Sequence, residues 1–81
     1  MIVKVLYFGA ARDVTSRKGE EVEIEGGATV SRLAAEILRT YPSMKPLRSS
    51  IRFSVNMEVA GEDTQLKEGD EVGVLPPVAG G

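Results

Sequence analysis

The last six residues of the chain, 76–81, are the part of the sequence best suited to chemistry. Their order is Pro-Pro-Val-Ala-Gly-Gly. Two adjacent prolines hold a chain in extended geometry, whereas two glycines, which lack a Cβ, leave its end slender. Six extended residues reach at most roughly 20 Å. We predict a tail that carries the carboxylate of Gly81 into a narrow pocket of a partner protein, and the inserted residues are Pro76, Pro77, Val78, Ala79 and Gly80.

A frayed terminus or a cloning remnant is the alternative interpretation of this glycine-rich end. Two features favour a functional tail. The prolines directly follow a predicted strand, and the sequence stops at the second glycine. A carboxylate is itself a poor electrophile, so the group on Gly81 would need activation before any transfer.

Composition excludes several other kinds of site. The chain has no cysteine and no histidine. Disulfides therefore cannot stabilise it, a metal site would need carboxylates alone, and acid–base work would fall to Asp, Glu, Lys or Tyr. We expect no bound metal, no bound cofactor and no catalytic residues.

Length and charge indicate the class of protein. The 81 residues, 42% of them hydrophobic, suffice for one small domain with a thin core. A net charge of −2 with scattered basic residues is unsuited to nucleic acid or to an anionic membrane surface. The apolar N-terminal segment 1–8 contains Lys4 and is too short for a signal peptide or a membrane span. We expect a soluble, cytoplasmic protein.

Two segments in the first third of the chain have the pattern of β-strands. Residues 2–8 are rich in β-branched and aromatic types, and Lys4 marks their solvent side. Residues 21–25 alternate strictly, with three glutamates outward. The charged and small polar residues of 12–19 predict a loop between the strands. The side chains expected to face the core are Val3, Val5, Tyr7, Val22 and Ile24.

Residues 30–40 predict a helix. Thr29 is a suitable N-cap, because its hydroxyl can accept a hydrogen bond from the first turn. Pro42 ends the helix, and Pro46 predicts an irregular segment after it. The apolar stripe consists of Val30, Leu33, Ala34, Ile37, Leu38 and Tyr41.

Three strands are predicted in the second half, at 51–55, 58–60 and 71–75, with a tight turn at 69–70 before the last one. Leu66 is expected in the core. A hairpin, a crossover helix and further strands give a two-layer α+β domain in which one main helix covers a small mixed sheet. This layout is that of the β-grasp, or ubiquitin-like, fold. We predict the domain at 1–75 and the tail at 76–81.

Three apolar residues are left on the outward side of the predicted sheet. Leu6 and Phe8 share the Lys4 side of the first strand, and Leu75 lies at the root of the tail. If the first and last strands are neighbours, these residues form one exposed patch, which is typical of a docking surface. A covering loop is the alternative. The glutamates of 21–25 are better explained as a solvated strand face than as metal ligands.

The chain resembles the small subunits of molybdopterin synthase, within the family of ubiquitin-like sulfur carriers. The segments that carry the resemblance are 3–8 (Val-Lys-Val-Leu-Tyr-Phe), Arg12-Asp13, 69–72 (Gly-Asp-Glu-Val) and 76–81. The family usually has Glu in place of Asp13. The start of the chain and its length favour the molybdopterin branch over the shorter thiamine-pathway carriers.

The resemblance implies a chemistry for Gly81. A separate adenylating enzyme, similar to ubiquitin-activating enzymes, would activate the carboxylate with ATP, and a persulfide donor would convert it to a thiocarboxylate. The carrier would then dock on the large synthase subunit and donate sulfur to a pterin precursor, forming the dithiolene. The implied assembly is a heterotetramer with two copies of each subunit. The absence of cysteine fits a carrier that holds sulfur as a thiocarboxylate.

Other uses of the same tail remain open at this point. It could be joined to lysines of other proteins, as in ubiquitin-like modifiers, or it could serve thiamine or cysteine synthesis. The chain is expected to be a sulfur-donating subunit of a complex rather than an enzyme on its own, because no nucleophile–base pair is visible in the sequence.

Overall fold

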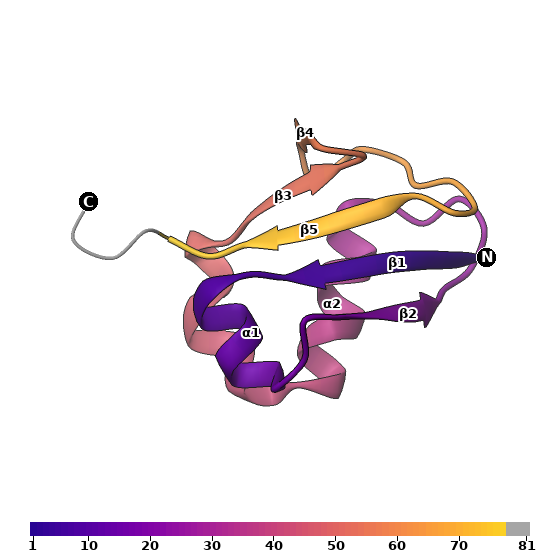
Figure 1. Ribbon diagram of the computed structural model, residues 1–81. Helices are drawn as coiled ribbons and strands as arrows, with labels where there is room; N and C mark the ends of the chain where they lie inside the picture. Colours follow the sequence, from indigo (N-terminus) through magenta and orange to yellow (C-terminus); the bar gives the residue numbers. More distant parts are fainter. Residues whose placement is uncertain (78–81) are drawn as a thin grey trace.

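A computed structural model describes residues 1–77. In this part of the chain, five strands form one sheet and the longer α-helix crosses one of its faces (Figure 1). No helix within it has the length and apolar character of a membrane span. The elements are β1 (Ile2–Tyr7), α1 (Gly9–Thr15), β2 (Gly19–Glu23), α2 (Val30–Thr40), the 3₁₀ helix η1 (Pro42–Ser50), β3 (Arg52–Val55), β4 (Glu58–Ala60) and β5 (Glu71–Leu75).

The sheet is mixed, with the strand order β2-β1-β5-β3-β4. The first and last strands pair in parallel at its centre, where Val5 lies opposite Val72, and the other pairings are antiparallel. The chain passes from β2 to β3 through α2, which covers the inner face (Figure 1). This is the β-grasp arrangement, so the predicted fold class is confirmed.

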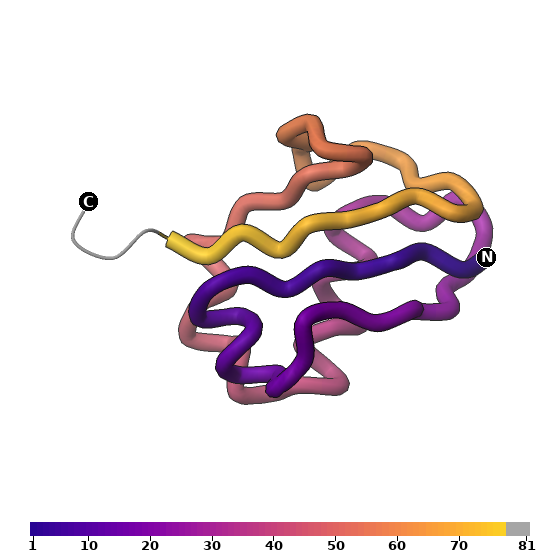
Figure 2. Tube along the Cα trace, in the orientation of Figure 1, coloured from indigo at the N-terminus to yellow at the C-terminus, as the bar shows by residue number. Residues whose placement is uncertain are grey.

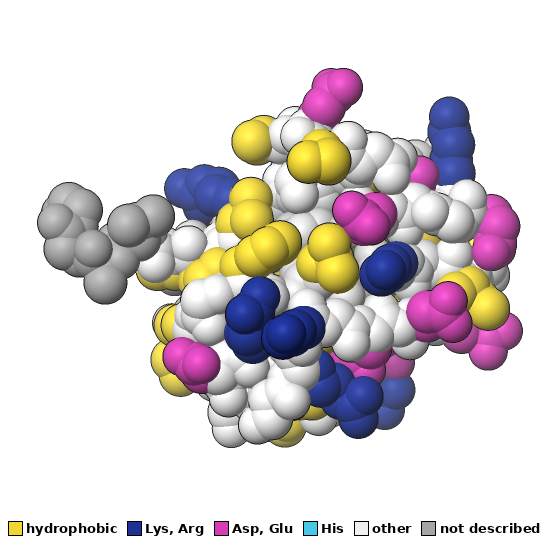
Figure 3. Space-filling view, in the orientation of Figure 1, with side chains coloured by type: hydrophobic (Ala, Val, Ile, Leu, Met, Phe, Trp, Pro, Cys, Tyr) yellow, Lys and Arg dark blue, Asp and Glu magenta, His cyan; other side chains and the backbone are white. Residues whose placement is uncertain are grey.

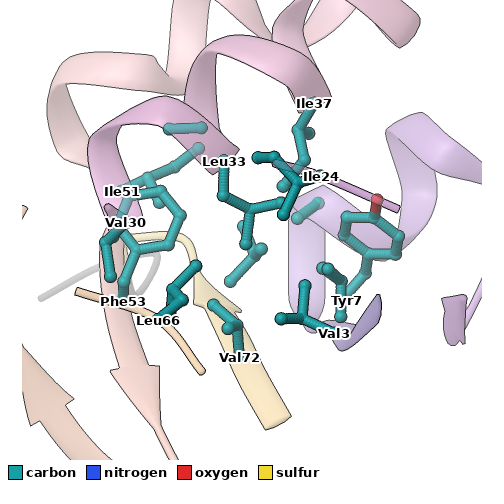
Figure 4. Packing of buried hydrophobic residues seen from close by; sticks show 14 of the residues in the cluster. Val3, Tyr7, Ile24, Val30, Leu33, Ile37, Ile51, Phe53, Leu66 and Val72 are labelled. Carbon is teal, nitrogen blue, oxygen red and sulfur yellow. The ribbon is translucent and has the colours of Figure 1, made fainter. Parts of the chain in front are cut away.

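The core lies between the two central strands and α2. Val3 and Val5 of β1 and Val72 of β5 are fully buried, because alternate residues of a strand point to the same face. They meet Leu33 of α2 from the opposite layer, as Figure 4 shows for the labelled residues. Each such side chain stabilises the fold by about 1.5–3 kcal/mol through its burial. Leu66 is also buried, as predicted.

Helix α2 has the predicted bounds and the predicted cap. The hydroxyl of Thr29 accepts a hydrogen bond from the backbone N–H of Arg32 at 3.2 Å. Four residues of the predicted stripe are fully or almost fully buried, and the other two pack at its margin. The buried four are Val30, Leu33, Ala34 and Ile37, and the marginal two are Leu38 and Tyr41.

The loop predicted at 12–19 is wrong at residues 12–15, because residues 9–15 form helix α1, whereas residues 16–18 are a loop. The carbonyl of Phe8 accepts hydrogen bonds from the N–H groups of Ala11 and Arg12, at 3.0 and 3.3 Å. Ala11 and Thr15, four residues apart, are buried, and the Thr15 hydroxyl donates to the Ala11 carbonyl at 2.9 Å. Two small buried residues make a stripe too short to recognise in the sequence, and contact with the domain stabilises this single short helix.

Two other predictions need correction. The second strand spans Gly19–Glu23 rather than 21–25, although Ile24 is buried as expected. The segment after Pro42 is the 3₁₀ helix η1 rather than irregular chain. Pro46 is compatible with η1, because the φ of about −65° that its ring imposes lies within the range of 3₁₀ helices.

A carboxylate joins two tyrosines on the inner side of the β1–β2 hairpin. Tyr7 is fully buried, and its hydroxyl donates to Glu20 Oε2 at 2.7 Å. The hydroxyl of Tyr41, at the end of α2, donates to the same oxygen at 2.7 Å. The rings meet edge to face, with their centroids 6.0 Å apart. This cluster ties β1, β2 and the end of α2 together.

Replacing Glu20 by Ala should destabilise the domain. Glu20→Ala leaves the buried hydroxyl of Tyr7 without its acceptor, and we expect the free energy of unfolding to fall by about 2–3 kcal/mol. Urea denaturation would measure the change. Glu21→Ala, at the exposed neighbouring position, is the matched control and should change stability by less than about 0.5 kcal/mol. Equal losses in the two variants would contradict this role of Glu20.

Alkaline pH should weaken the fold through the same cluster. Burial, and then the hydrogen bond and charge of Glu20, raise the pKa of Tyr7 well above its ordinary value of 10.0. The unfolded chain therefore loses this proton at a lower pH than the folded chain, so stability falls as pH rises above 10. Tyr7→Phe should be less stable at pH 7 but should decline less steeply between pH 10 and pH 11.5. Urea unfolding at each pH would measure the free energy of unfolding. An equal decline in the two proteins over this pH range would show that Tyr7 does not contribute.

Candidate functional site

The tail begins at the end of the central strand β5. The end of β5 lies at the opposite end of the molecule from the start of β1 (Figure 2). The N–H of Phe8 donates to the carbonyl of Val74 at 3.3 Å, so the start of α1 lies beside the tail root. Gly9 has φ +50°, and a Cβ there would lie 3.2 Å from Pro76 Cγ. Pro76 therefore packs against Gly9, a position without a side chain, so the first tail residue contacts the start of α1.

The outer face of the sheet carries a groove of about 260 Å³ beside this root. Hydrophobic side chains gather on this face, from the tail across β1 and β5 toward the β3–β4 hairpin (Figure 3). Phe8 is 40% exposed and Val59 is 81% exposed. The lining residues are Leu6, Phe8, Ser54, Met57, Val59, Glu71, Gly73 and Leu75.

Gly73 keeps the middle of the groove open. It lies on β5, opposite Leu6 on one side and Ser54 on the other. A Cβ at this position would lie 2.4 Å from Ser54 Oγ and 3.5 Å from Phe8 Cε2. The groove is therefore hollow because a central strand position carries no side chain, while its neighbours supply the walls.

Most of the groove lining is apolar. Glu71 is its ionisable side chain and Ser54 supplies a hydroxyl, and among the described residues no hydrogen bond joins the two. Within residues 1–77, no cluster of three or more His, Cys, Asp or Glu could hold a metal ion.

The ion pairs that stand out lie on and around α2. Arg32 Nε lies 2.8 Å from Glu25 Oε2, so one of the glutamates predicted as a solvated face is paired. Arg39, and then Arg32, donate hydrogen bonds to Glu36 and lower the pKa of its carboxyl. Arg48, a residue of η1, pairs with Glu62. These exposed pairs contribute little to stability and none of their residues lines the groove.

Comparison with known proteins decides the family. The sequence model of the ThiS family matches residues 5–81. A molybdopterin synthase sulfur carrier subunit from Mycobacterium tuberculosis is 42% identical over 82 residues, covering 98% of this chain and 96% of the relative. This chain belongs to the ThiS family. The resemblance recognised from the sequence is therefore confirmed.

Solved structures agree with the ThiS-family assignment. A Pyrococcus furiosus protein described as molybdopterin converting factor subunit 1 is 34% identical, covers 95% of this chain and 98% of its own, and superposes with a TM-score of 0.86. Small archaeal modifier protein 1 from Methanosarcina acetivorans is 26% identical, with coverage of 99% and 96% and a TM-score of 0.85. A complex of subunits 1 and 2 of the Helicobacter pylori molybdopterin-converting factor contains a chain 27% identical, with full coverage of both and a TM-score of 0.71.

The structure brings together the three residues predicted as a patch. Leu6, Phe8 and Leu75 line one groove of this ThiS-family chain, and no loop of the described part closes it. Whether they bind a partner stays a prediction. The tail residues Pro76 and Pro77 follow β5, and residues 78–81, including Gly81, lie outside the described residues.

Sequence reasoning missed the part of the groove that the β3–β4 hairpin and the first residues of β5 supply. The missed residues are Ser54, Met57, Val59, Glu71 and Gly73. Val59 has a signal that could have been used, because it alternates with Glu58 and Ala60 on a short strand. Gly73 has none, because a glycine within a strand does not reveal which neighbours surround it.

Replacing Phe8 by Lys should weaken partner binding without unfolding the domain. Phe8→Lys places a charge in the groove, and we expect at least a tenfold rise in the Kd for the partner proposed below. Ile2→Lys is the matched control, because Ile2 is 42% exposed, points to the same side of β1 and does not line the groove. Thermal unfolding and calorimetric titration would measure both effects. Equal weakening by the two variants would show that the groove has no special role.

Proposed function

We propose that this chain is the sulfur carrier subunit of a molybdopterin synthase. The observation that carries the proposal is the match of a sulfur-carrier relative over 98% of the chain, together with a family match that runs to Gly81. The position of the tail supports it. The first tail residues, Pro76 and Pro77, directly follow the central strand, beside an apolar groove on which a partner can dock.

The reaction sequence starts with activation of Gly81. Its carboxylate attacks the α-phosphorus of ATP, releasing pyrophosphate and leaving an acyl adenylate, and the adenylating enzyme supplies the catalytic groups. The terminal sulfur of a persulfide then attacks the acyl carbon, and the bond to AMP breaks. A thiol reduces the resulting acyl disulfide, which releases a thiocarboxylate on Gly81. Thiolate sulfur is a strong nucleophile near neutral pH, so the thiocarboxylate can attack a carbon of the pterin precursor and displace an oxygen substituent from it. Water then cleaves the resulting thioester, which leaves the sulfur on the pterin and returns the carboxylate of Gly81.

The large synthase subunit is the proposed docking partner. The Helicobacter pylori relative is found in a complex of subunits 1 and 2, which supports a subunit of the same kind here. Two sulfurs are needed for one dithiolene, so we propose two carriers and two large subunits in the assembly. The groove lined by Leu6, Phe8 and Leu75 would contact the large subunit while the tail, 76–81, enters its active site.

Deleting Gly81 tests the carrier chemistry. The truncated chain should form no thiocarboxylate and support no dithiolene synthesis. Its melting temperature should stay unchanged, because the core cluster lies within residues 1–77. Mass spectrometry after incubation with the adenylating enzyme, ATP and the persulfide donor measures the first effect. Gly81→Ala keeps a terminal carboxylate at the same length, so it should keep part of the activity. Full activity of the truncated chain would refute the proposal.

Protein modification is the second candidate function. The likeness to small archaeal modifier protein 1 favours testing it. A pull-down from the host with an N-terminal tag leaves Gly81 free, and a wash with denaturant separates the outcomes. A stoichiometric partner released by denaturant supports the carrier function. Partners that stay attached through a Gly-Gly remnant on lysine would show that the chain modifies proteins.

A further inference from the structure

The turn between β3 and β4 has a backbone that favours glycine. Val55 pairs with Glu58, so Asn56 and Met57 form a two-residue hairpin loop. Their φ angles are +52° and +73°, as a type I′ turn requires. Asn followed by Gly is the preferred pair for this turn, because an L side chain at positive φ brings its Cβ close to the backbone. Met57 occupies the position where Gly is preferred.

Within residues 1–77, packing gives Met57 little compensation for this conformation. The side chain of Met57 is 89% exposed. An exposed apolar side chain at positive φ gains little from burial in the free chain and retains the cost of its backbone. Strained positions of this kind are commonly associated with function.

Hydrogen bonds hold the turn against the start of β5. The N–H of Asn56 donates to the carbonyl of Glu71 at 2.7 Å, and its side-chain amide donates to Asp70 Oδ1 at 2.9 Å. The N–H of Glu71 donates back to Asn56 Oδ1 at 3.0 Å. Met57 is therefore presented from a fixed turn.

Met57 lines the end of the groove where β3 and β4 meet, and the groove continues to the tail root. Val59 lines the same groove, and Phe8 and Leu75 line it beside the tail root. Gly81 lies at most roughly 20 Å along the chain from Leu75. A protein that holds Gly81 in its active site must therefore come close to the tail root. Stable interfaces bury about 800 Å² on each partner, so such a protein is expected to extend along the groove.

We propose that Met57 is a contact of this chain with the large synthase subunit, packing against an apolar segment of that subunit at the far end of the groove. The inference rests on the proposed function. Methionine suits such a contact, because its unbranched thioether side chain adapts to an irregular apolar surface. The strain of the turn is retained because glycine at this position would remove the contact.

Replacing Met57 by Gly should move stability and binding in opposite directions. Met57→Gly relieves the strained backbone, so the melting temperature of the free chain should rise by about 4–8 °C. The same variant loses the side chain, so the Kd for the large subunit, measured by calorimetric titration, should rise about tenfold. Met57→Ala keeps the strain and removes most of the side chain, so it should show the same weaker binding without the gain in stability. Met57→Leu should restore binding.

Ser16→Gly is the matched control for the strain. Ser16 ends α1 with φ +58°, is exposed and does not line the groove. This variant should gain stability and bind the large subunit like the wild type. Unchanged binding by Met57→Gly and Met57→Ala would overturn the inference, as would variants that impair adenylation but bind the large subunit normally. A wild-type chain that does not bind the large subunit would instead overturn the partner in the proposed function.

Discussion

The parallel pairing of β1 with β5 is the constraint on which the rest of the structure depends. It brings the two ends of the domain sequence together at the centre of the sheet. Parallel strands need a long connection, and the segment between these two supplies α2, η1 and the β3–β4 hairpin. The tail consequently follows a strand that is hydrogen-bonded on both sides, which gives its root a fixed direction and position.

The two faces of these central strands have separate roles. On the inner face, Val5, Val72 and Val74 pack against α2 and provide stability. On the outer face, Leu6 and Gly73 form part of the groove. Because alternate residues point to opposite faces, a change in the groove need not disturb the core. A binding surface built on paired strands is also held more firmly than one built on loops.

The sequence was most informative where a pattern is long and local. The stripe of α2 and its Thr29 cap predict the helix with its bounds, and the alternation around Lys4 predicts the inner and outer faces of β1. Helix α1 was missed because tertiary contacts of Ala11 and Thr15, rather than a periodic pattern, stabilise it. For the groove, strand order was decisive. Placing the first and last strands side by side was enough to join Leu6, Phe8 and Leu75, whereas the contribution of the β3–β4 hairpin depends on its own pairing and turn.

Local preference and native structure agree in most of the domain and disagree at the β3–β4 turn. The Asn56 side chain fits its positive φ and bonds to the start of β5, so this half of the turn follows from sequence preferences. Met57 follows none of them, since glycine would relieve the backbone and a polar residue would suit the 89% exposure. Consistency across levels is the rule in natural sequences, and exceptions concentrate where function imposes a different requirement. The exception here lies on the groove that begins at the tail root, so the demand that best explains it is one made by a bound protein.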